Sequence, residues 1–169
     1  MKYGMLIMAF LMLSISGFSQ ADAISTYFSK YQEDTSFTVV YISPKMFEMI
    51  SKLAEDEIEP EVQQVIKDLK GLRILTTERN GMKYYNEVTK KLNLKAYDEL
   101  MTVRDGDSNV RFVVKDNGDI IEELLLLVGS EEEFVMISFV GKINLEKIAK
   151  LANSADIDGL EHLEKVGQD

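Results

Sequence analysis

The sequence predicts an α+β fold in which an antiparallel meander of four strands, plus two earlier strands, is covered by about four to five helices. Residues 97–141 contain four apolar runs of strand length, separated by short turns rich in Gly, Asn and Asp. Before them, segments with helical periodicity alternate with two β-branched runs. The chain of 169 residues has no internal repeat, and its length suits one domain with a real core.

The first 19 residues have the layout of a secretory signal peptide. Lys2 provides the positive flank, residues 5–13 form an uncharged apolar core, and small or polar residues follow up to Ser19. The apolar run is short for a membrane span, which needs about 20 residues. We therefore predict export, with cleavage after Ser19 and a second cleavage site at residues 21–23.

The next segments predict two helices around a strand. Residues 22–31 have apolar side chains at helical spacing behind Asp22 as a cap: Ile24, Tyr27, Phe28 and Tyr31. Residues 36–42 are β-branched and aromatic, which is typical of a strand. Ser43 and Pro44 then predict the start of a helix over residues 44–54. Its predicted buried residues are Met46, Phe47, Ile50, Leu53 and Ala54.

A third helix, a second strand and a fourth helix are predicted before the meander. Pro60 begins a helix with the apolar stripe Val62, Val65, Ile66 and Leu69, and Gly71 is the predicted cap at its end. Residues 72–78 form the strand. Asn80-Gly81 predicts a turn, and the spacing of Tyr85, Val88 and Leu92 favours a helix after it.

The most apolar stretch after the N-terminus, LLLLVGSEEEFVMISFVGKI (124–143), predicts a buried hairpin. Each half is about seven residues long, too short for a bilayer helix, and an isolated hairpin has unpaired edges that lipid does not tolerate. The turn between the halves lacks the lysine and the glycine spacing of a phosphate-binding loop. Successive apolar residues indicate strands covered on both faces, at the centre of the sheet.

A last helix, capped by Asn144 and running to residue 152, is expected to cover one face of the sheet. Residues 154–169 are acidic and weakly patterned, which indicates an acidic C-terminal tail or a frayed helix. Residues 20–153 therefore form the predicted single α+β domain.

Charge and cysteine content limit the function classes. After removal of the signal the chain has 18 basic and 29 acidic residues, a net charge of −11, which opposes binding to nucleic acid and to anionic lipid. The sequence contains no cysteine, which excludes disulfides, thiolate metal sites and a lipid anchor on cysteine.

The residues that usually carry catalysis are scarce. His162 is the single histidine, so neither a histidine metal site nor a serine–histidine triad is expected. Asp105, Asp107, Asn109 and Asp116 have partial calcium-loop spacing, but Val110 replaces the glycine that such a loop needs. Paired carboxylates could come from Asp98, Glu99, Glu122 and Glu123, yet a chain so rich in acids has such neighbours by chance. We predict no catalytic, cofactor-binding or metal-binding residue, no cofactor, and a protein that is not an enzyme.

Three pieces of the chain resemble the bacterial family known as domain of unknown function 4252. They are VVYISPKMF (39–47), LKGLRIL (69–75) and residues 97–152, which begin YDELMTVRDGDSNVRFVVKDNGD. The resemblance implies a small exported protein of the cell envelope, encoded near envelope-stress sigma and anti-sigma factors, and therefore an accessory role in that signalling. Many relatives carry a lipoprotein cysteine that this chain lacks, so a periplasmic or secreted protein is expected, soluble after signal cleavage.

Two functions are favoured by the sequence, ahead of an enzyme, which would need a cleft where carboxylates converge. The first is a non-enzymatic binding or interaction module whose partner is another envelope protein. The second is a periplasmic carrier of a small molecule or lipid, with Met46, Met49, Met101 and Met136 lining an adaptable apolar pocket. No nucleic-acid partner and no stable membrane span are expected, and the oligomeric state stays open.

Overall fold

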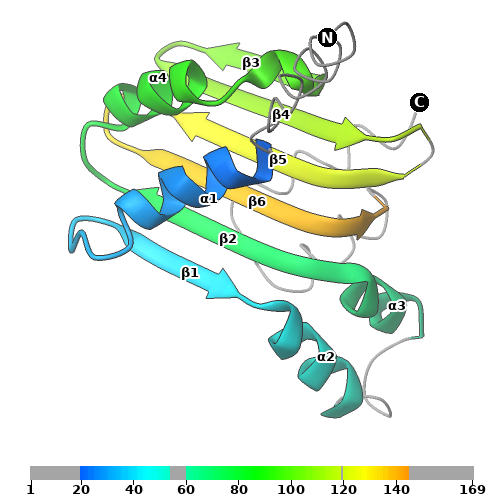
Figure 1. The fold of residues 1–169 in the computed structure, drawn as a ribbon. Helices are drawn as coiled ribbons and strands as arrows, with labels where there is room; N and C mark the ends of the chain where they lie inside the picture. The colour runs from blue at the N-terminus through cyan, green and yellow to red at the C-terminus, as the bar shows by residue number, and fades with distance from the viewer. Residues whose placement is uncertain (1–19, 54–59, 119, 145–169) are drawn as a thin grey trace, which may run out of the picture.

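A computed structural model describes residues 20–53, 60–118 and 120–144 and has the predicted α+β fold (Figure 1). The chain begins with α1 (Gln20–Lys30), β1 (Thr38–Ile42), α2 (Pro44–Leu53) and α3 (Pro60–Asp68). It continues with β2 (Leu69–Thr77), α4 (Gly81–Lys91) and a 3-10 turn, η1 (Leu94–Ala96). The last strands are β3 (Asp98–Asp105), β4 (Ser108–Asp116), β5 (Ile121–Gly129) and β6 (Phe134–Ile143).

The six strands form one antiparallel sheet in the order β1-β2-β6-β5-β4-β3. Strands β3 to β6 are consecutive neighbours, so the predicted meander is confirmed. The β5–β6 hairpin occupies the centre of the sheet, and Leu124 to Leu127 are all buried although they alternate between the two faces. The run of successive apolar residues therefore reflects a strand that is covered on both faces, as predicted.

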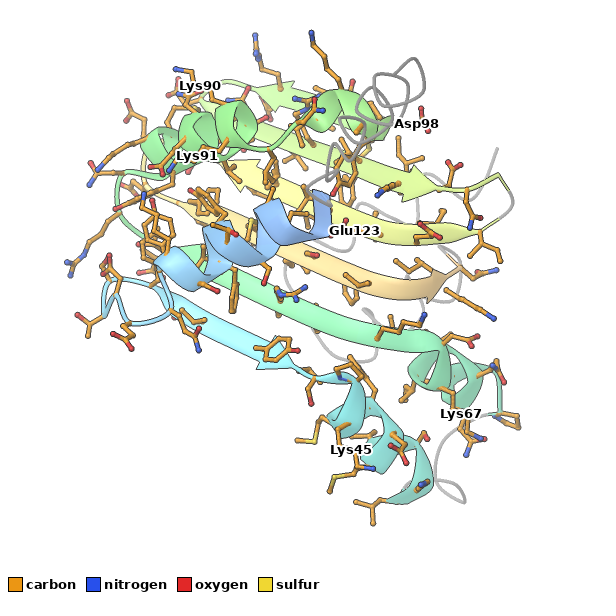
Figure 2. The ribbon with its side chains drawn as sticks, in the orientation of Figure 1. Lys45, Lys67, Lys90, Lys91, Asp98 and Glu123 are labelled. Carbon is orange, nitrogen blue, oxygen red and sulfur yellow. The ribbon has the colours of Figure 1, made fainter. Side chains whose placement is uncertain are left out.

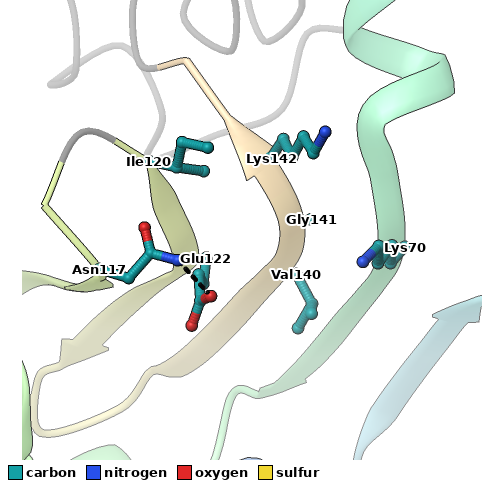
Figure 3. A pocket seen from close by; sticks show the side chains of 7 residues that line it. All are labelled: Lys70, Asn117, Ile120, Glu122, Val140, Gly141 and Lys142. Atoms are coloured by element: carbon teal, nitrogen blue, oxygen red, sulfur yellow. Dashed lines mark hydrogen bonds between the residues drawn. The ribbon is translucent and has the colours of Figure 1, made fainter.

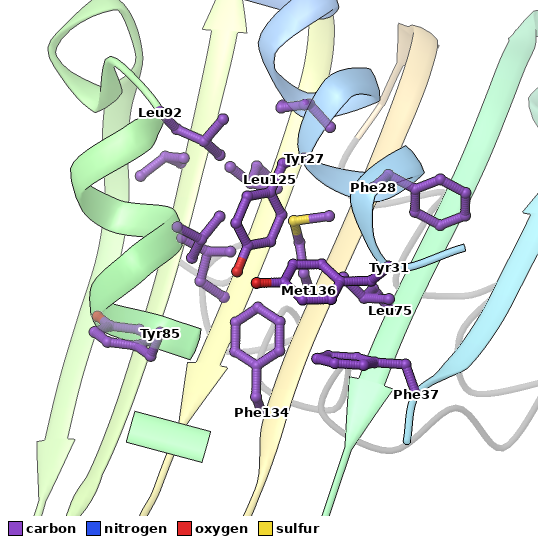
Figure 4. Close-up of a cluster of buried hydrophobic side chains, with 14 of the residues drawn as sticks. Tyr27, Phe28, Tyr31, Phe37, Leu75, Tyr85, Leu92, Leu125, Phe134 and Met136 are labelled. Carbon is purple, nitrogen blue, oxygen red and sulfur yellow. The ribbon is translucent and has the colours of Figure 1, made fainter. Parts of the chain in front are cut away.

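Helices α1 and α4 cover one face of the sheet (Figure 4). Ile24, Tyr27 and Phe28 of α1 and Tyr31 directly after it are all buried, as their helical spacing predicts. The ring of Tyr31 lies 4.5 Å from that of Phe37 and 5.2 Å from that of Tyr27, within the range of favourable aromatic pairs. Leu125, Leu127 and Met136 complete this layer from the sheet side.

Helices α2 and α3 contribute to the apolar cluster on the opposite face. Phe47 of α2 and Val65 and Ile66 of α3 are buried against side chains of the sheet. The sheet side of this cluster includes Leu72, Phe112, Leu124, Leu126, Ile137 and Phe139. Figure 1 shows α2 and α3 together at one end of the sheet, beyond the end of β1.

Two local predictions are wrong. Met46 and Leu53 were expected in the core but are 49% and 81% exposed, because α2 turns a narrower face to the sheet than its five apolar residues span. Gly71 caps no helix, since α3 ends at Asp68 and β2 has already begun at Leu69. The turn predicted at Asn80-Gly81 is confirmed, since Asn80 adopts a left-handed conformation (φ 52°) as the N-cap of α4 and the predicted helix follows directly.

Some predictions lie outside the described residues: the signal peptide, Ala54, the helix after Asn144, the tail over 154–169 and His162. Of the helices in the described ranges, none combines the length and the hydrophobicity of a membrane span.

Candidate functional site

Helix α2 presents three side-chain rows, because successive residues in a helix turn by about 100°. Phe47, Ile50 and Ser51 face the sheet. Lys45, Glu48 and Lys52 form a charged row, in which the carboxylate of Glu48 pairs with Lys45 at 2.8 Å and Lys52 at 2.6 Å. The third row, Met46, Met49 and Leu53, is apolar and exposed; we call it the outer stripe.

The outer stripe lies on a helix that is capped at its start and anchored in the core. Ser43 caps α2 through a hydrogen bond from the Met46 backbone N–H to Ser43 Oγ (3.3 Å), and Pro44 occupies the first helical position. Phe47 anchors the opposite face of the helix in the core. Methionine side chains are flexible and polarizable, which suits them to contact irregular apolar surfaces. Large apolar side chains held out in water on one helix face are typical of a docking surface.

Strand β1, directly before α2, is one of the two edge strands and has no charged residue. Val40 is 37% exposed and Tyr41 is 54% exposed. The opposite edge strand, β3, has four charged residues among its eight and a register irregularity between Glu99 and Met101. Charges and bulges protect an edge against pairing with other strands. Strand β1 has neither a charge nor a bulge. Its short length of five residues is the one protective feature that it has, so it is the more open edge.

A shallow hollow of about 280 Å³ lies between the ends of β2, β5 and β6 (Figure 3). Lys70 and Lys142 line it together with Glu122, which accepts a hydrogen bond of 2.9 Å from Asn117. The two ammonium groups and one carboxylate make it weakly positive. The described residues around it provide neither a buried donor nor a nucleophile.

A second hollow, of about 320 Å³, lies where β1 starts and β2 ends. Hydroxyl side chains dominate its lining: Thr35, Ser36, Thr38, Thr76 and Thr77. The buried Thr77 hydroxyl donates a hydrogen bond of 2.8 Å to the Ser36 carbonyl, so its proton holds the turn before β1 against the end of β2.

The four carboxylates considered from the sequence do not converge. Asp98 is exposed at the start of β3, and Glu99 pairs with Arg111 at 2.6 Å. Glu122 is exposed, whereas Glu123 is buried on the sheet face that carries α1 and α4 (Figure 2). Tyr97 and Ser138 both donate hydrogen bonds to Glu123.

The residues with calcium-loop spacing form a hairpin. Asp105 ends β3, and Asn109 and Asp116 belong to β4, so the segment is extended and does not encircle an ion. Gly106 takes a positive φ of 55° at the turn. Within the described parts of the chain, no three His, Cys, Asp or Glu side chains group closely enough to hold a metal.

The four methionines proposed for a carrier pocket are also separated. Met136 is fully buried under α1 and α4, Met101 packs partly buried against the other face, and Met46 and Met49 are exposed on α2. Neither hollow described above is lined by methionine. The structure thus gives these residues no common pocket.

Comparison with known families matches residues 31–151 to the family described as Domain of unknown function (DUF4252). The chain belongs to the DUF4252 family. The match covers every strand of the sheet and begins just after α1. Comparison with curated proteins finds no match, and comparison with solved structures finds none.

The sequence interpretation missed two features of this DUF4252 domain. Met46 and Leu53 of the outer stripe were counted as core, although five apolar residues among 46–53 span more than the single face that a flanking helix can bury. Glu123 was treated as one acid among many. A charged residue inside an otherwise buried strand was the sequence feature that could have marked Glu123. Its hydrogen-bond partners, Tyr97 and Ser138, are too far away in sequence to be recognised.

Proposed function

We propose that this DUF4252 protein is a non-enzymatic, exported interaction module of the cell envelope, which docks another envelope protein on the outer stripe of α2. The observation that carries the proposal is the exposure of Met46, Met49 and Leu53 on a capped and anchored helix. A partner that covers these side chains removes apolar surface from water, which is the main favourable term in protein association.

The charged row beside the outer stripe supports a protein partner. Lys45 and Lys52 flank Glu48 and give this side of α2 a net positive charge, in a chain whose net charge is −10. An apolar centre beside a charged rim is the usual anatomy of a protein–protein interface. The rim favours a partner with acidic residues around an apolar contact.

Export and envelope location rest on the signal-peptide pattern of residues 1–19. The family resemblance supports an accessory role in envelope-stress signalling. Fractionation of the producing cell followed by N-terminal sequencing checks the location; we expect the protein outside the cytoplasm with Gln20 first. Recovery of the protein in the cytoplasm with Met1 or Lys2 first would overturn this part.

Site-specific photo-crosslinking tests the docking surface. A photoreactive phenylalanine analogue at Met49 should give one dominant adduct in living cells, with an exported protein that mass spectrometry identifies. The same analogue at Asn86, an exposed position of α4, serves as the matched control and should not give that adduct.

The adduct must also depend on the apolar side chains. With the analogue at Leu53, the double variant Met46→Gln and Met49→Gln should lose at least about 80% of it, because removal of central interface residues costs over 1 kcal/mol each. Lys45→Gln on the charged row of the same helix should retain most of it. Equal adducts from positions 49 and 86, or an adduct indifferent to the double variant, would refute the docking surface.

A further inference from the structure

We infer that β1 is a self-complementary edge: two copies of this chain pair through β1 in antiparallel register. Their two six-stranded sheets then form a single sheet of twelve strands. This goes beyond the proposed function, because it concerns a second surface and a different partner.

The side chains of β1 match those of a second β1. In an antiparallel pair related by a two-fold axis at Val40, Val40 lies opposite its own copy, and Tyr41 lies opposite Val39. Aromatic and β-branched residues in opposite positions are favourable cross-strand pairs. Val40 and Tyr41 are both exposed in the single chain, so this pairing buries apolar area that is now in water.

The charges at the two ends of β1 match in the same arrangement. Glu33 and Asp34 are exposed just before β1, and Lys45 begins the net positive row just after it. In an antiparallel pair the acidic turn before β1 of one copy lies at the same end of the joint as the start of α2, with Lys45, of the other copy, so groups of opposite charge come together. The contact occurs twice, once at each end. A parallel pairing would instead bring like charges together.

The acidic end of β1 is held in a defined turn. Asp34 Oδ1 accepts hydrogen bonds from the Ser36 backbone N–H (2.9 Å) and from Ser36 Oγ (2.7 Å). These hydrogen bonds fix the turn that leads into β1. A preformed turn reduces the entropy that a second copy would lose on binding.

The other edge of the sheet provides a matched comparison. Val103 of β3 is 39% exposed, nearly the same as Val40, but four of the eight residues of its strand are charged. With three acidic residues and one arginine, β3 has a net charge of −2, which opposes the pairing of two β3 strands. The structure therefore favours one edge for self-association and disfavours the other.

Disulfide trapping tests the pairing directly, because the chain contains no other cysteine. Val40→Cys places a thiol opposite its own copy, where the Cα separation in an antiparallel pair, about 4.5 to 5.5 Å, permits a disulfide. We expect mild oxidation of the purified protein to convert most of Val40→Cys into a covalent dimer. Val103→Cys should stay largely monomeric under the same conditions.

Sedimentation equilibrium gives an independent measurement. The unmodified protein should have twice the mass of one chain, Val40→Lys should sediment as a monomer, and Val103→Lys should remain a dimer. Circular dichroism checks that each variant is folded. If a lysine variant is unfolded, disulfide trapping of Val40→Cys and Val103→Cys tests the pairing in its place.

The opposite results would overturn the inference. These are equal trapping at positions 40 and 103, or a monomeric unmodified protein. If Val40→Lys instead abolishes the photo-crosslinked adduct at Met49 while Val40→Cys forms no covalent dimer, β1 binds the envelope partner and not a second copy. A covalent dimer without any adduct at Met49 would leave the pairing intact and refute only the proposed function.

Discussion

Tyr97 donates a hydrogen bond of 2.7 Å to Oε2 of Glu123, across a layer of the protein from which water is excluded. The other carboxylate oxygen of Glu123 accepts a hydrogen bond of 3.1 Å from the fully buried Ser138 hydroxyl. A carboxylate in an apolar layer is costly unless donors surround it. The two hydroxyl groups therefore determine whether β5 can carry a glutamate at this position.

Tyr97→Phe should destabilise the protein by about 1–3 kcal/mol, because it leaves one oxygen of a buried carboxylate without its donor. Urea unfolding followed by circular dichroism measures the loss. Tyr41→Phe, at an exposed position, is the matched control and should change the free energy of unfolding by less than about 0.5 kcal/mol. Equal effects of the two substitutions would contradict the role assigned to Tyr97.

Alkaline pH should destabilise the fold through buried tyrosines. Burial, and then the nearby Glu123, raise the pKa of Tyr97 above its ordinary value of 10.0; burial, and then Tyr31, do the same for Tyr27. The unfolded chain therefore loses these protons first, and stability falls as the pH rises above about 10. Each tyrosine contributes at most about 1.4 kcal/mol per pH unit to that slope.

Unfolding measured from pH 9 to pH 11.5 checks this expectation. Tyr27→Phe should make the slope above pH 10 shallower than in the unmodified protein, while the two proteins keep parallel pH profiles from pH 7 to pH 9. An unchanged slope would show that Tyr27 ionises as readily in the folded state as in the unfolded one.

Glu87 should stabilise the contact between α1 and α4 in a pH-dependent way. Partial burial acts to raise the pKa of Glu87, but hydrogen bonds from Lys30 (2.6 Å), Lys91 (2.7 Å) and Tyr31 (3.1 Å) lower it to about 2. A lowered pKa in the folded state gives stability that is present above the ordinary value of 4.5 and is lost as the pH falls toward 2. Solvent screens both lysines, so we expect about 1 kcal/mol.

Glu87→Gln should therefore lower the stability at pH 7 by that amount and flatten the profile between pH 4.5 and pH 2. Glu48→Gln is the control. Glu48 also pairs with two lysines, but it lies on the surface of one helix and joins no second element, so its loss should matter less. If the two variants behave alike, the bridge between α1 and α4 contributes no more than a surface ion pair.

Gly141→Ala should destabilise the sheet by more than about 2 kcal/mol. Gly141 has a φ of 150°, and a Cβ atom there would meet the Asp68 carbonyl oxygen at 2.3 Å. Gly71→Ala on the neighbouring strand is the control, because a Cβ atom at Gly71 has nothing within 4 Å. We expect Gly71→Ala to be neutral or slightly stabilising. Thermal unfolding of both variants measures the difference.

The sequence predicted the parts of the fold that depend on local pattern. The apolar run at Leu124–Leu127 identified the centre of the sheet because only a strand covered on both faces tolerates such a run. The helical spacing of Ile24, Tyr27 and Phe28 identified the buried face of α1 for the same kind of reason. The exposed stripe of α2 could not be separated from its core face, because both are apolar and only packing against β2 and α3 divides them.

By itself, the amino-acid sequence determined the α+β class, the meander and the absence of cysteine chemistry, since these follow from the spacing of apolar residues, from turn residues and from composition. Only the tertiary structure decided that Met46 and Met49 face water, that Glu123 meets Tyr97 and Ser138, and that β1 is the uncharged edge of the sheet. The physical reason is the same in each case. Exposure, partners and edges are properties of segments that meet in space, and no local pattern in the chain encodes which segments will meet.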